Sequence, residues 1–125
     1  MDELIARIAA ASGSEPEVAR KAVGVILDFL RKEGPQAEVD ELFASVPGAA
    51  EAAATAADSS GALSGLAGMM GGGLMGLAAR LTALGLGMGQ MQATGKEVFA
   101  FVREKAGDER VGQVAAAIPG LSQFL

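Results

Sequence analysis

The chain has 125 residues, a formal net charge of −5, and no cysteine or histidine. This length predicts one domain with enough chain to bury a core, and the missing residue types exclude disulfides, thiolate metal ligands and the commonest general base. Because the ten basic residues are scattered through an acidic chain, no basic stripe is available for phosphates, and we expect no nucleic-acid partner.

The first residues predict a short helix. Asp2 suits its N-cap, an apolar stripe follows, and Gly13 stands where a C′ glycine would end it. The acidic start lacks the basic and apolar regions of a signal peptide, so we expect a cytoplasmic location.

Two further helices are predicted between capping residues and prolines. Ser14 and Glu17 have the spacing of a capping box, with Ser14 as the N-cap. Gly34-Pro35 is expected to end the first of these helices, and Pro47-Gly48 the second. The first helix is predicted to bury one face, made of Val18, Ala22, Ile26, Phe29 and Leu30.

Residues 49–57 are almost all alanine, which favours a helix but offers little side-chain surface for packing. The stretch from Ser59 to Gly95 follows, and its 37 residues hold one charge, Arg80, with eleven of the 18 glycines and five of the six methionines. Gly71-Gly72-Gly73 is expected to interrupt any helix there.

The clearest helical periodicity comes next. Apolar residues step by 3, 4, 3 and 4 along the sequence and predict a narrow seam suited to one facing helix; they are Leu74, Leu77, Leu81, Leu84 and Met88. A long helix is expected from about Met88 to Lys105, then a short one through Val111 and Val114, with a stop at Pro119-Gly120.

An ungapped comparison at an offset of 72 residues aligns the landmarks of the two halves. Phe29 falls on Phe101, Pro47-Gly48 falls on Pro119-Gly120, and six of the 20 positions from Phe29 to Gly48 are identical. We therefore predict an all-α fold in one domain, residues 1–125, with both phenylalanines in equivalent buried sites. Two pseudo-symmetric copies of a three-helix unit are expected about a pseudo-twofold axis, at residues 2–53 and 74–125. An alanine-, glycine- and methionine-rich connector, residues 54–73, joins them.

This order of elements resembles a family of uncharacterised bacterial proteins typified by VcgC and VcgE. The resemblance covers nearly the whole chain: a capped helix before a Pro-Gly stop over residues 14–48, a glycine-rich middle, and Leu84-Gly85-Leu86 before a second long helix. It implies the fold only, because the family has no assigned activity. Members often begin with a signal peptide, and we expect none here, so an exported location is not implied.

We expect no enzyme, cofactor or metal site. The carboxylates lie at helix starts or on polar faces, where capping and solvation account for them. Asp40 and Glu41 are adjacent, so on a helix they point apart and make a poor acid–base pair. Neither an EF-hand spacing nor a phosphate-loop motif is present.

The central region is the candidate interaction surface. Glycines four residues apart make a smooth helical ridge that a second helix can approach, and methionines adapt to varied partners or fill gaps in the chain's own core. The candidate residues are Met69, Met70, Leu74, Leu77, Leu81, Leu84 and Met88. We expect a non-catalytic interaction or assembly protein that forms a homo-oligomer through this region or binds a protein partner.

The alternative is a peripheral membrane or lipid-binding protein with weak lipid contact through the same stretch. Residues 59–79 form an uncharged run of 21, which is long enough to span a bilayer. Its glycines and serines, and the lack of flanking aromatic or basic clusters, argue against a span.

Overall fold

The computed structural model describes residues 2–59 and 73–118, with side chains described over residues 2–54 and 76–118. All the regular structure in these ranges is helical, which confirms the all-α prediction for this part of the chain. The elements are α1 (Asp2–Ser12), α2 (Pro16–Glu33), α3 (Gln36–Ser45), α4 (Ala49–Ser59), α6 (Gly73–Ala83), α7 (Met88–Ala106) and α8 (Asp108–Ala117).

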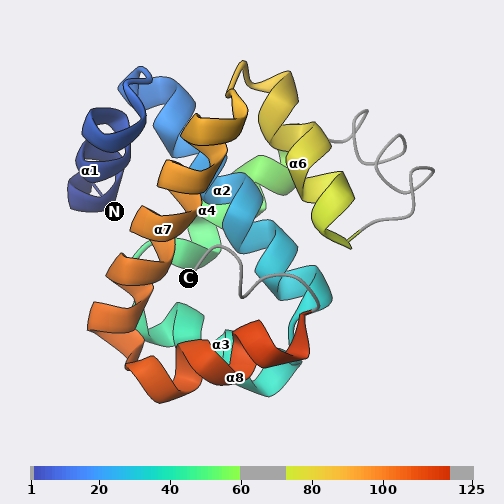
Figure 1. Cartoon of the computed structure of the whole chain (residues 1–125). Coiled ribbons are helices and arrows are strands. Elements are labelled where there is room, and N and C mark those ends of the chain that lie inside the picture. The colour runs from blue at the N-terminus through green and yellow to red at the C-terminus, as the bar shows by residue number, and fades with distance from the viewer. Residues whose placement is uncertain (1, 60–72, 119–125) are drawn as a thin grey trace.

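Helix α2 lies at the centre of the described helices and is buried on all sides over its middle turns. Helices α1, α3, α4, α6 and α7 all pack on it (Figure 1). Every residue from Ala22 to Leu30 is buried, as expected of a helix that is apolar around its whole circumference. The prediction of one buried face was therefore too narrow, because neighbouring helices cover the opposite face as well.

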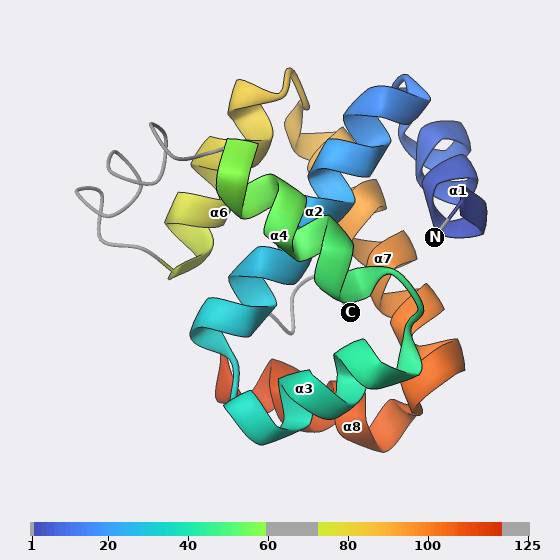
Figure 2. The same ribbon diagram turned by 180° about the vertical axis from the view of Figure 1, so that it is seen from behind.

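The alanine-rich helix α4 supplies much of that cover. Seen from behind, α4 lies across α2 (Figure 2), and the contact between them is the most extensive in the fold. Ala49 and Ala53 are fully buried there. Small side chains let two helix backbones approach closely, so the expectation that this segment offers little to pack was wrong.

Two pairs of helices complete the arrangement around α2. Helix α1 packs along α7, and α3 packs against α8 at the opposite end of the molecule from the α1–α2 and α6–α7 turns (Figures 1 and 2). Exposed ion pairs join both: Arg7 to Glu104 at 3.2 Å and Arg110 to Glu41 at 2.8 Å. Pairs of this kind contribute little to stability, typically about 0–1 kcal/mol, so apolar burial holds these helices together.

The helix ends test several predictions. Helix α1 ends at Ser12, and Gly13 has the positive φ of 69° predicted for a C′ glycine. The capping box was wrong: Glu15 is the N-cap of α2 without a side-chain cap bond, and the Ser14 hydroxyl lies 2.6 Å from that of Ser12. The local pattern assigned the Ser14 hydroxyl to the N-cap of α2. In the structure this hydroxyl instead hydrogen-bonds with that of Ser12 at the end of α1.

The Pro-Gly stops are partly testable. Helix α3 ends at Ser45 and α4 starts at Ala49, so Pro47-Gly48 separates two helices, as predicted. Helix α8 ends at Ala117, while Pro119-Gly120 lies outside the described residues.

The predicted start of the connector falls inside a helix. Helix α4 runs from Ala49 to Ser59 and so passes through residue 54, where the connector was expected to start. The rest of the connector, residues 60–72, lies outside the described residues, and α6 begins at Gly73.

Candidate functional site

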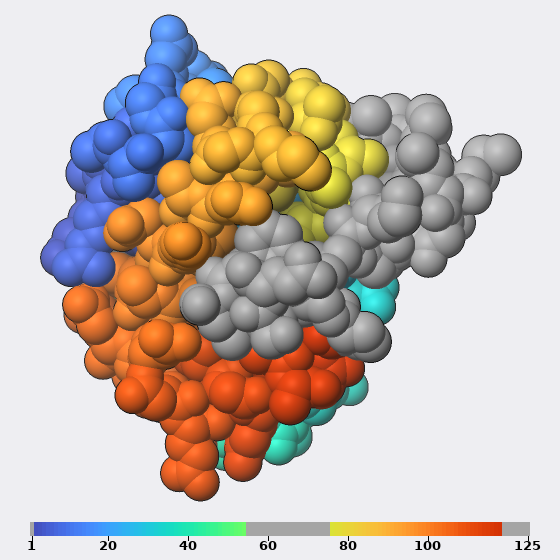
Figure 3. Space-filling view, viewed as in Figure 1, coloured from blue at the N-terminus to red at the C-terminus, as the bar shows by residue number. Residues whose placement is uncertain are grey.

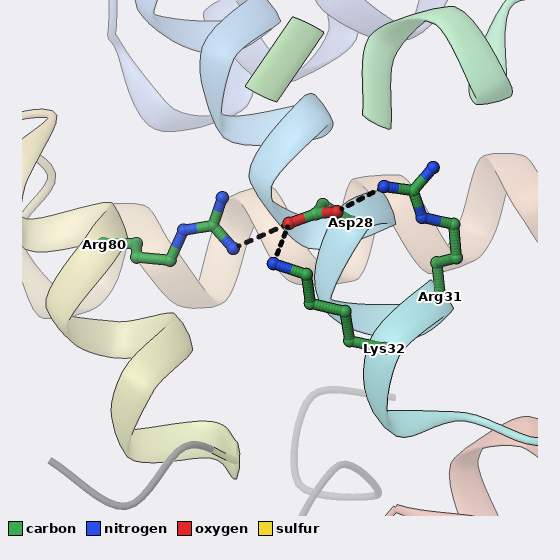
Figure 4. A network of polar contacts seen from close by, with 4 residues as sticks. All are labelled: Asp28, Arg31, Lys32 and Arg80. Carbon is green, nitrogen blue, oxygen red and sulfur yellow. Dashed lines mark hydrogen bonds and ion pairs between the residues drawn. The ribbon is translucent and has the colours of Figure 1, made fainter. Parts of the chain in front are cut away.

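The largest polar cluster in the described interior is built around Asp28. Its side chain has no exposed surface. Three cations contact the carboxylate (Figure 4): Arg31 Nη2 lies 2.9 Å from Oδ1, while Lys32 Nζ at 3.2 Å and Arg80 Nη1 at 3.1 Å contact Oδ2. Because a buried carboxylate is costly unless it is paired and hydrogen-bonded, these contacts explain how an acid is tolerated in the central helix.

Two of the three cations come from the same helix as Asp28. Arg31 and Lys32 follow it at i+3 and i+4, the spacings at which helical side chains are neighbours. Their side chains are 42% and 51% exposed, so each lies partly at the surface. One carboxylate and two cations are thus assembled by α2 alone, before any other helix packs on it.

Arg80 comes from α6 and is the only one of the three cations that is buried, with 9% of its side chain exposed. It is also the single charge in the stretch from Ser59 to Gly95. The contact with Asp28 joins residues 52 apart and bridges α6 to α2. Both carboxylate oxygens are engaged by cations, so neither is presented to a substrate as an acid or a base.

The predicted interaction residues do not form one surface. Leu77 and Leu81 are buried in the chain's own core, at 7% and 4% exposure, and Leu84 is half-buried against it. Met88 is 78% exposed. Met69 and Met70 lie outside the described residues, as does the side chain of Leu74.

The continuous seam is a prediction that the structure corrects. Helix α6 ends at Ala83, and a turn containing Gly85, with φ 91°, reverses the chain before α7 starts at Met88. The 3-4-3-4 spacing therefore spans two helices. The apolar spacing continues through the turn, so periodicity alone could not reveal it; the positive φ of Gly85 makes the turn possible.

Sequence reasoning overlooked Asp28. A local signal for part of the cluster was available, since an acid followed by bases at i+3 and i+4 predicts helical ion pairs. Its place in a run of apolar residues was a second signal, because an acid there must be paired if buried. Neither signal identifies Arg80 as the third cation, since that contact depends on how α6 packs.

Among the side chains described within residues 2–59 and 73–118, no three acidic, histidine or cysteine groups are placed as a metal site would require. Within the same ranges, no helix has both the length and the apolar character needed to cross a bilayer.

Comparison with protein-family models, with curated proteins and with solved structures finds no match to this chain. Its function is therefore inferred from its own residues.

Proposed function

We propose that this protein is a non-catalytic helical interaction protein that associates with a second copy of itself. The contact surface is the apolar edge where α6 turns into α7, made of Leu84, Met88 and Met91. Met69 and Met70, which precede α6 in the sequence, and Leu74 in its first turn extend this surface on the grounds of their sequence.

The observation that carries the proposal is the exposure of Met88. Among the described residues it is the large apolar side chain left at the surface, whereas the others are buried or half-buried. Leu84 and Met91, both half-buried, lie within four residues of it in the sequence. An exposed apolar group next to partly covered ones is typical of a contact site, and methionine adapts to the shape of its partner.

We also propose that the chain consists of two copies of one helical unit. In support, shifting α2 and α3 by 72 residues gives residues 88–105 and 108–117, against Met88–Ala106 and Asp108–Ala117 for α7 and α8. Gly13 and Gly85, 72 apart, both have positive φ, and Phe29 and Phe101 are both buried. The packing is reciprocal, since α1 contacts α7 and α2 contacts α6. Helix α4 has no described counterpart.

A matched pair of variants tests the association surface. Met88 is the first residue of α7, where the helix dipole favours an acidic side chain, so Met88→Glu is compatible with the fold. Gly89→Glu adds the same charge one residue later, at a position where an added Cβ meets no atom within 4 Å. Burying a methionine stabilises a contact by roughly 1.5–3 kcal/mol, so Met88→Glu should weaken association about 10- to 100-fold.

The measurement is the mass in solution by sedimentation over a range of concentrations. Gly89→Glu should associate as the wild type does, and Met88→Glu should not. A wild type that stays monomeric throughout would overturn the proposal, and so would equal weakening by both variants, since charge alone would then account for the loss.

Lipid binding is the second candidate, favoured by the uncharged run over residues 59–79. It predicts co-flotation of the protein with anionic and neutral vesicles, and loss of flotation when Met69, Met70 and Leu74 are replaced by serine. Flotation that survives these replacements would contradict lipid contact through this stretch.

A further inference from the structure

Met88 is held at the surface by the way in which α7 begins. The Gln90 carboxamide oxygen accepts a hydrogen bond from the Gly87 amide at 2.8 Å, and its Nε2 donates to the Ser12 carbonyl oxygen at 3.0 Å. These two bonds fix the first turn of α7 against the end of α1, while the buried Leu86 anchors the preceding turn in the core. Met88 lies between these anchors and is nevertheless 78% exposed, so a defined turn places its thioether in solvent.

The surroundings of Met88 are open. The turn between α6 and α7 lies at the top of the ribbon and surface views (Figures 1 and 3). The residues that flank Met88 here are exposed glycines, Gly85, Gly87 and Gly89. A small reagent in solution therefore reaches the sulfur without any movement of the fold.

The composition of the chain makes the methionine thioethers its oxidisable groups. The whole sequence lacks cysteine, tryptophan and tyrosine, the other side chains that oxidants readily modify. The described part of the chain holds two methionine side chains: Met88 is exposed, and Met91 is half-buried against the core. Because susceptibility to oxidation follows exposure, Met88 is the more reactive of the two.

We infer that Met88 is a reversible oxidation site that controls the association of this protein. The inference rests on the proposed function, in which Met88 contacts a second copy. Hydrogen peroxide transfers one oxygen atom to the thioether: the O–O bond breaks, an S–O bond forms, and the sulfur loses two electrons. The other oxygen leaves as water with both hydrogens of the peroxide. A methionine sulfoxide reductase reverses the step, since two thiols are oxidised to a disulfide and the oxygen leaves as water.

The sulfoxide alters the contact and spares the fold. Oxidation converts a flexible apolar side chain into a polar one, and in a single chain the added oxygen at Met88 stays hydrated because the residue is exposed. A contact that buries Met88 would remove this water, so the oxidised protein should associate on the order of tenfold more weakly or less. Conversely, association shields the sulfur, so oxidation takes place in the separate chain.

Mass spectrometry of the folded wild type treated with hydrogen peroxide tests the site. Trypsin releases residues 81–96, a peptide that contains Met88 and Met91 and no other methionine, and its fragments assign the added oxygen. Met88 should gain oxygen severalfold faster than Met91. Its rate should also fall as the protein concentration rises.

Sedimentation of the same samples tests the control of association. Peroxide should weaken the association of the wild type, reductase treatment should restore it, and the helical circular dichroism should stay unchanged throughout. Met88→Leu keeps an apolar side chain but has no sulfur at this position. Compared with its own untreated sample, Met88→Leu should associate equally well after peroxide.

The results that overturn the inference differ from those that overturn the proposed function. Oxygen appearing on Met91 as fast as on Met88 would refute the site. An oxidised wild type that associates as the untreated protein does would refute the control, and so would a loss of association by peroxide-treated Met88→Leu, since another methionine would then cause it. An untreated wild type that is monomeric at every concentration refutes the proposed function, and the control falls with it. The mass measurement decides the oxidation site in either case.

Discussion

Replacing Gly34 by alanine should destabilise the protein because its Cβ would collide with the α2–α3 corner. Gly34 has an extended backbone, φ −84° and ψ 166°, that alanine adopts readily. An added Cβ would nevertheless lie 2.7 Å from the Leu30 carbonyl oxygen and 2.8 Å from Val39 Cγ2. Neither atom moves freely: that carbonyl accepts the Gly34 amide at 2.8 Å, and Val39 is 1% exposed and stiff at χ1.

The expected magnitude follows from two opposing effects. Forcing an extra carbon into a packed core costs about 1–3 kcal/mol, and the lower entropy of the unfolded chain offsets at most ~1 kcal/mol. The free energy of unfolding should therefore fall by about 1–2 kcal/mol. Gly112→Ala is the matched control, because Gly112 is exposed inside α8 and its added Cβ meets nothing within 4 Å. There the free energy of unfolding should rise by about 0.5–1 kcal/mol.

Urea unfolding followed by far-ultraviolet circular dichroism measures both variants, since the chain has no tryptophan or tyrosine to serve as a fluorescent probe. Opposite signs for the two glycines are the expected result. A Gly34→Ala protein as stable as the wild type would refute the close approach of α3 to the end of α2.

Three other perturbations follow from the burial pattern. Phe29→Ala and Phe101→Ala should each lower the free energy of unfolding by roughly 3–5 kcal/mol, because both rings are buried. Phe43→Ala, at a half-buried ring, should lower it clearly less. A small loss at only one of the first two sites would contradict their equivalence. Leu81→Asp should abolish the cooperative thermal transition, because an unpaired carboxylate would be buried. A Leu81→Asp protein that stays folded but no longer associates with a second copy would show instead that Leu81 faces a partner. Ala53→Leu should lower stability by about 1–3 kcal/mol by pushing α4 away from α2, and unchanged stability would contradict their close contact.

Several boundaries of the fold could be predicted from the sequence because local chemistry determines them. Gly13 ends α1 and Pro47-Gly48 separates α3 from α4, since a positive φ and a missing amide hydrogen are properties of the residues themselves. Helix α7 starts at Met88, where a long helix was expected to begin.

The failures share a physical cause: each depended on which neighbour a residue meets. Ser14 had the right spacing for an N-cap, but the Ser12 hydroxyl lies within hydrogen-bond distance of it. The spacing from Leu74 to Met88 could not reveal that the helix stops at Ala83. Among the candidate interaction residues, Met88 is exposed while Leu77 and Leu81 are buried. The apolar spacing gives all three residues the same pattern, so it could not predict this difference.

The sequence by itself determined that the chain is helical and where most helices begin and end, because propensity, capping and backbone restriction act within a few residues. Only the tertiary structure decided that α2 is enclosed on all sides, that an alanine helix forms its largest contact, and that Arg80 meets Asp28 across 52 residues. Apolar attraction is non-directional and polar pairing depends on the final positions of whole helices, so these contacts are set when the helices pack together.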